Sequence, residues 1–195
     1  MAYPSFSAGD VLAASDMNAV GLWKNTTATV TSVGGTSATA SNGTITIGSG
    51  NTSVTVSGAF STTYDAYRII ISNLTVSASG QLRYNNDGAT TNYSYGNPLV
   101  TIATGVFDSN RGAAQAYIDL GATTTSQGNA FSFDVINPFL AVATIFTGFG
   151  YQNSTTFGGV GTGIHTTATS YTGFRLVPST GSLSGGTIRI YGYRN

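Results

Sequence analysis

The sequence predicts an all-β protein, an antiparallel β-sandwich of jelly-roll-like type, on three observations. Only 7% of the 195 residues are charged and glutamate is absent, so the Glu and Lys side chains that usually coat helices are scarce. Threonine, valine, isoleucine, tyrosine and phenylalanine, which favour strands, recur along the chain. Apolar and polar residues alternate with period two in short segments between glycine-rich turns.

Each expected strand follows from a local pattern. Alternation indicates strands at 28–33, 43–47 and 52–56. A more buried strand is expected at 67–76, around Ile69-Ile70-Ile71, and the segment that begins at 80–84 ends in a strong turn signal at 85–88. Further strands are expected at 114–120, 130–136, 141–149, 171–177 and 186–193.

Residues 1–24 form the only helix-compatible stretch, which predicts a short N-terminal anchor segment ahead of a β-sandwich domain at 25–195. A helix of about two turns is expected within 13–22, with Ser15 or Asp16 near its start to accept free backbone N–H groups. A helix this short is marginal alone, so it must dock. The anchor would use six apolar residues: Val11, Leu12, Met17, Val20, Leu22 and Trp23. The alternative is that Trp23 and the helix pack into this domain's own core.

Composition argues against several classes of function. Without cysteine there is no disulfide framework or thiol-based zinc site, and no metal or cofactor is expected. The net charge is zero and the arginines are scattered, which argues against nucleic-acid binding. No apolar run approaches the ~20 residues of a membrane span, and the N-terminus lacks the features of a signal peptide.

Glycine-rich and histidine-containing segments near residue 160 give no catalytic signal. The run 158–163 lacks the lysine of a phosphate-binding loop, so flexible loops or tight strand crossings explain its glycines. His165 is the only histidine, and we interpret it as a satisfied or exposed loop residue, since no cysteine or glutamate is present to join it.

Paired carboxylates would permit glycosidase chemistry. The seven aspartates are spaced singly, mostly at predicted turns, and only Asp119 and Asp134 lie in predicted strands from which they could approach each other. Capping, turn and ion-pair roles explain these residues better. The sequence therefore predicts a protein that is not an enzyme.

The segment 84–97 is the best candidate for ligand contact. Tyrosine rings stack on sugars and Asn or Asp bonds hydroxyl groups, and such mixed surfaces are common at recognition sites. A glycan or receptor site here would use Tyr84, Asn86, Asp87, Asn92, Tyr93 and Tyr95. The alternative is a β-hairpin whose tyrosines pack across the strands.

Three stretches of the chain carry a resemblance to a known family. They are F-S-A-G-D-V-L-A-A-S-D-M-N at 6–18, I-N-P-F-L at 136–140 and S-G-G-T-I-R-I-Y-G-Y-R-N at 184–195. They resemble small structural proteins of tailed phages, often labelled minor tail or tail-fibre proteins, many of which open with F-x-A-G-D-V-L-T-A-A-D-M-N. Ala13 here replaces the usual threonine of that motif, and Ser15 replaces an alanine.

The resemblance implies a virion structural protein on the exterior of a phage particle, made in the cytoplasm of the bacterial host. It further implies a homotrimer that contacts other phage structural proteins. Two functions stay open. One is host attachment, as a short tail fibre or receptor-binding tip anchored by the N-terminus, which the opening motif favours. The other is a capsid decoration or cement protein, which the small size and the absence of a shaft repeat favour.

Overall fold

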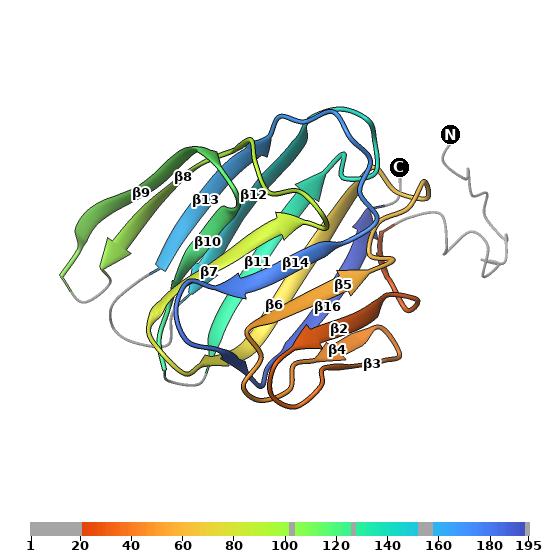
Figure 1. The fold of residues 1–195 in the computed structure, drawn as a ribbon. Helices are drawn as coiled ribbons and strands as arrows, with labels where there is room; N and C mark the ends of the chain where they lie inside the picture. Colours follow the sequence, from red (N-terminus) through yellow and green to blue (C-terminus); the bar gives the residue numbers. More distant parts are fainter. Residues whose placement is uncertain (1–20, 102–103, 126–127, 152–157, 194–195) are drawn as a thin grey trace, which may run out of the picture.

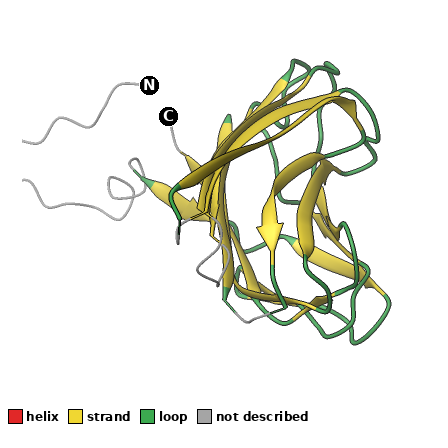
Figure 2. Cartoon of the chain, turned by 90° about the vertical axis from the view of Figure 1, so that its left-hand side faces the viewer, coloured by secondary structure: helices red, strands yellow, loops and turns green. Residues whose placement is uncertain are grey.

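The computed structural model describes residues 21–101, 104–125, 128–151 and 158–193. Within them the chain forms strands and no helix, arranged as two antiparallel sheets that face each other (Figures 1 and 2). The prediction of an all-β sandwich is confirmed. The expected N-terminal helix is not seen: residues 13–20 lie outside the described residues, and Leu22 belongs to a strand.

The larger sheet has eleven strands in the order β3-β4-β16-β6-β11-β12-β13-β8-β9, with β1 paired to β16 and β15 paired to β6. Its strands are β1 (Leu22–Lys24), β3 (Thr39–Ser41), β4 (Thr44–Thr46), β6 (Ala66–Val76), β8 (Tyr93–Thr101), β9 (Val106–Gln115), β11 (Asn129–Ile136), β12 (Thr144–Tyr151), β13 (Gly158–His165), β15 (Leu183–Ser184) and β16 (Thr187–Tyr193).

The smaller sheet has five strands in the order β10-β7-β14-β5-β2. They are β2 (Thr29–Val33), β5 (Ser53–Ser57), β7 (Gly80–Asn86), β10 (Ile118–Thr123) and β14 (Phe174–Pro178). The chain passes repeatedly from one sheet to the other, so segments far apart in sequence become neighbours (Figure 1).

The core lies between the two sheets and follows from the alternation in the strands. In β11, Phe131, Phe133 and Val135 point inward and are buried, while the residues between them are only half-buried. Strand β6 alternates in the same way around Ile69 and Ile71. The central strands β6 and β11 of the larger sheet thus have an inner face against the core and an outer face that the smaller sheet does not cover (Figure 2).

Several segments differ from the sequence prediction. No strand was predicted at β8 or over 106–113 of β9, and residues 85–86, predicted as part of a turn, end strand β7. The run 158–163 is part of strand β13, paired with β12 and β8, and is not a loop. The strand predicted at 114–120 instead spans the end of β9 and the start of β10, which belong to different sheets. Ala114 has a positive φ of 52°, and this backbone kink ends the ladder between β8 and β9 in an irregular register.

Candidate functional site

Three loops that are distant in sequence meet at one end of the sandwich, and we call them the tip. The backbone N–H of Thr166 donates to the carbonyl of Asn92 at 3.2 Å, and that of Tyr171 donates to the carbonyl of Pro138 at 2.8 Å. These bonds hold together the loops that follow β7, β13 and β11, namely 87–92, 166–173 and 137–143. The tip is therefore a composite surface on a rigid scaffold, where recognition sites commonly form.

Polar side chains dominate the exposed surface of the tip. Asn92 has a positive φ of 66°, a conformation that Asn tolerates better than most residues, and its Nδ2 donates to Thr167 Oγ1 at 3.1 Å. An apolar rim is formed by Leu140 and Val142. The exposed polar residues of the first two loops are Asp87, Thr90, Thr91, Asn92, Thr166, Thr169, Ser170 and Thr172.

Three of the six predicted ligand residues lie beneath the tip. Tyr84, Asn86 and Tyr93 are completely buried. The Tyr84 hydroxyl donates to Asn86 Oδ1 at 2.8 Å, and the backbone N–H of Asn86 donates to the Tyr93 hydroxyl at 2.7 Å. The prediction is corrected for these three residues: they support the loops from inside, as the packed-hairpin alternative implies, and their rings are not available to a ligand.

The other three predicted residues do not stay together. Asp87 and Asn92 are exposed in the tip. Tyr95 lies away from it, with its ring 6.5 Å from that of Tyr117. Partial burial, with a smaller contribution from the charge of Asp119, raises the pKa of Tyr95 to about 12. The sequence therefore identified one of the tip loops and missed the other two, although the Thr166-Thr167 doublet mirrors Thr90-Thr91.

His165 forms the centre of the floor below the tip. It is 1% exposed, at the end of β13, and not in a loop as predicted. Its ring stacks on Tyr93 at 4.2 Å between centroids and meets Tyr171 edge-on at 5.4 Å. Burial lowers the pKa of His165, and a hydrogen bond with the backbone of Thr91 opposes this shift only in part. The neutral form of His165 is thus built into the support of loop 87–92.

The two strand carboxylates are held in different places. Asp134, on the outer face of the larger sheet, accepts a bidentate pair of hydrogen bonds from Arg68 at 2.9 and 2.8 Å and another from the Tyr193 hydroxyl at 2.7 Å. Partial burial alone would raise the pKa of Asp134, but the bonds from Arg68 and Tyr193 outweigh it and leave the pKa below its usual value.

Asp119 is buried in β10, at the edge of the smaller sheet. It accepts hydrogen bonds from Asn110 Nδ2 at 2.8 Å and from the backbone N–H of Gly121 at 3.1 Å. Burial raises the pKa of Asp119, and these bonds offset part of the increase. Because Asp119 and Asp134 lie on different sheets with separate partners, they do not form a pair of carboxylates across one substrate.

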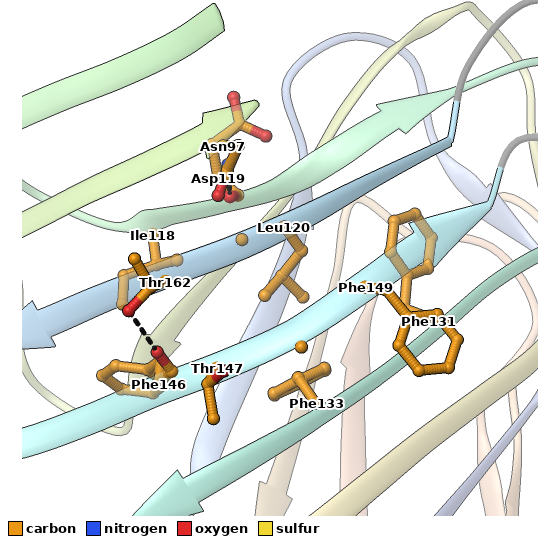
Figure 3. Close-up of a pocket in the computed structure, with 12 residues that line it drawn as sticks. Asn97, Ile118, Asp119, Leu120, Phe131, Phe133, Phe146, Thr147, Phe149 and Thr162 are labelled. Carbon is orange, nitrogen blue, oxygen red and sulfur yellow. Dashed lines mark hydrogen bonds between the residues drawn. The ribbon is translucent and has the colours of Figure 1, made fainter. Parts of the chain in front are cut away.

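A cavity between the sheets adjoins Asp119 (Figure 3). Figure 3 shows Asn97 beside Asp119, whereas apolar side chains, including Phe131, Phe133 and Phe146, line much of the remainder. Its volume, about 20 Å³ for the centre of a water-sized sphere, is enough for roughly one water molecule. The cavity therefore does not hold an organic ligand, which leaves the external surfaces as candidates for binding.

The predicted anchor residues are only partly within the described residues. Val11, Leu12, Met17 and Val20 lie outside them. Leu22 and Trp23 are in β1 and pair with Tyr193 and Gly192 of β16, so this strand joins the sandwich across the boundary predicted at residue 24. Trp23 is half-buried in this strand and is not among the core residues.

Neither a metal site nor a membrane-spanning helix occurs among the described residues. No group of three or more His, Asp or Glu side chains there is arranged to hold a metal ion. No helix long and apolar enough to span a membrane occurs in the same part of the chain. Comparison with protein-family models, curated proteins and solved structures gives no match to this chain.

Proposed function

We propose that this protein is a non-enzymatic structural module on the exterior of a tailed-phage particle, and that it attaches the particle to its host through the tip. The observation that carries the proposal is the composite surface formed by loops 87–92, 166–173 and 137–143. Its exposed hydroxyl, amide and carboxyl groups match the hydrogen-bonding needs of a cell-surface glycan or of a polar protein surface.

The support under the tip favours recognition. Buried hydrogen bonds among Tyr84, Asn86 and Tyr93, together with the stacked His165, fix the bases of the loops. A surface that is ordered before it binds loses less conformational entropy in the complex. The separate placement of Asp119 and Asp134 supports a binding role over glycoside hydrolysis, which requires two carboxyl groups about 5–10 Å apart across the substrate.

Placement on a phage particle rests on the resemblance of segments 6–18, 136–140 and 184–195 to small phage tail proteins. The repeated passage of the chain between two antiparallel sheets supports a jelly-roll-like fold, which is common in viral capsid proteins. The proposal includes a homotrimer on the virion exterior, made in the host cytoplasm. The anchor predicted at 1–24, which would hold the module to other phage proteins, is narrowed to residues 1–20 because 22–24 pair with β16.

The tip is tested by binding of labelled, purified protein to host cells. Thr90→Lys and Ser170→Lys place long charged side chains on two of the tip loops, at positions exposed to solvent. Thr31→Lys, exposed on β2 of the smaller sheet, is the matched control. We expect the two tip variants to lose binding to host cells and to compete less well with phage for adsorption. The control should bind and compete as the parent protein does. Unchanged binding by both tip variants would refute attachment through the tip.

The particle itself distinguishes the two virion functions. A reconstruction of the particle that places the chain on the tail, with the tip facing outward, supports attachment. A chain bound across capsid subunits would instead indicate a capsid decoration protein. The same reconstruction gives the number of copies in each assembly.

A further inference from the structure

A second surface, separate from the tip, is apolar and lies on the outer face of the larger sheet. It is formed by Phe107, Phe149 and Val160, and we call it the outer strip. Their exposed fractions are 79%, 60% and 63%, which is unusual for large apolar side chains that lie together. The strip crosses the adjacent strands β12, β13, β8 and β9 (Figure 1).

Strand register places these side chains on one face. Phe149 pairs with Val160 across β12 and β13, and Phe107 pairs with Val100 across β9 and β8. Phe146, three residues before Phe149 on the same strand, is 2% exposed and points into the core, so alternation directs Phe149 outward. The strip is therefore a continuous surface feature and not a set of isolated exposed residues.

The strip includes both projections and a hollow. A shallow depression runs between the side chains of Phe107, Phe149 and Val160, and its remaining lining is Pro98, Val100, Gly150, Gly158 and Gly159. Glycines contribute little more than backbone to this lining, which leaves space beside the projecting phenyl rings. A ring from one copy can enter the hollow of the next, and such head-to-tail contacts repeat around the axis of a closed ring such as a trimer.

Charge favours the same partner. None of the residues that line the depression is ionisable. The nearest charged side chains, Arg68 and Asp134, border Phe149 and Val160 and are paired with each other, so they bring no net charge to the strip. The chain has a net charge of zero with only 7% charged residues, and two copies can approach without like-charge repulsion. A neutral, apolar surface matches another copy of itself.

The exposed area is sufficient for the centre of an interface. With ~150–250 Å² for a fully buried aromatic side chain, the exposures above leave roughly 300–400 Å² on the three residues. This is nearly half of the ~800 Å² that each partner buries in an interface of standard size. Half-exposed or polar neighbours on the same face, such as Ile145 and Thr162, supply the rim.

We propose that the outer strip is the contact surface between copies of this chain, with the phenyl rings of each copy in the hollow of the next. This inference does not depend on attachment through the tip, because the two surfaces use different residues. It assigns the tip and the strip to separate tasks, one to bind the host and one to assemble.

The test is the mass of the full chain in solution, measured by light scattering and sedimentation. Phe107→Ser combined with Phe149→Ser removes the strip. Val33→Ser is the matched control, since Val33 is 61% exposed on β2 of the smaller sheet. We expect an oligomer for the parent chain and the control. The double variant should be a folded monomer, or require at least about tenfold more protein to assemble. A monomeric parent chain would overturn the proposal, as would a double variant that assembles as the parent does.

A cross-linking measurement tests the position directly. The chain has no cysteine, so Val160→Cys introduces a single reactive site on the strip. A short bis-maleimide should join two copies of this variant and leave Val33→Cys unlinked. Linkage of Val33→Cys alone would place the interface on the smaller sheet, and a strip covered by residues 1–20 of the same chain would leave both variants unlinked. Either result contradicts the proposal.

Discussion

The close approach of β11 and β12 can be tested at Gly148, which pairs with Phe133 across the two strands. A Cβ added to Gly148 would lie 2.3 Å from Phe133 Cβ and 2.5 Å from both Phe133 Cα and Ser132 O. Directly opposite Cβ atoms in a sheet are usually about 4.5–5.5 Å apart. Two of the three contacts are with backbone atoms, so Gly148→Ala requires the strands to separate.

We expect Gly148→Ala to lower the free energy of unfolding by about 1–3 kcal/mol, the usual cost of an overpacked core. For a chain of this size that corresponds to a fall of roughly 2–12 °C in the melting temperature, measured by circular dichroism. Gly96→Ala is the control, since Gly96 lies in β8 of the same sheet and an added Cβ there meets nothing within 4 Å. A Gly148→Ala protein that melts with the parent, or a control that falls as far, would show that the contact does not limit packing.

Three further predictions concern the floor of the tip and the outer face. Tyr84→Phe should cost about 1–3 kcal/mol in urea unfolding, because it leaves the buried Asn86 Oδ1 without its donor, whereas Tyr191→Phe on the outer face should be nearly neutral. Because burial lowers the pKa of His165, the unfolded chain binds the proton first. The contribution of neutral His165 to the free energy of unfolding is then at its full value above about pH 6.5 and declines as the pH falls below it. The melting temperature of the parent should therefore fall as the pH drops below about 6.5, and that of His165→Phe should fall less. The same pH dependence in both proteins would contradict a buried, neutral His165. Asp134→Asn should cost about 1 kcal/mol or less, since the pair with Arg68 is partly exposed to solvent. Because the pKa of Asp134 is lowered, the parent should lose more stability below about pH 4 than this variant does. Equal losses in the two proteins at acid pH would argue against a stabilising ion pair between Asp134 and Arg68.

Two N-terminal truncations test the predicted anchor segment and the role of β1. Deletion of residues 1–20 keeps β1 and its pairing with β16, so the truncated protein should fold as the parent does and fail to join the particle. The protein that lacks residues 1–24 should be less stable than the one that lacks 1–20, because it also loses Trp23 from the edge of the larger sheet. Equal melting temperatures for the two truncations, measured side by side, would show that β1 contributes nothing to the sandwich.

The fold class follows from the sequence because alternation is a local property. The strand predicted at 130–136 is observed as β11 with its inward phenylalanines, and the strand predicted at 67–76 is observed as β6. Glycine-rich strand β13 escaped prediction, since glycine has no side chain from which alternation can be detected. The glycines of β13 are required by close neighbours from other strands. A Cβ at Gly161 would lie 2.2 Å from Asn97 Oδ1, and one at Gly163 would lie 2.8 Å from Ile118 Cδ1.

The sequence by itself determined the all-β class, the strands with clear alternation such as β6 and β11, and the turn at Asp87-Gly88. Only the tertiary structure decided that Tyr84, Asn86 and Tyr93 face the core, that loop 166–173 joins loop 87–92, and that Phe149 is exposed while Phe146 is buried. The physical reason is that a strand's pattern defines two faces without stating which face the second sheet covers. That choice is made when residues distant in sequence pack together.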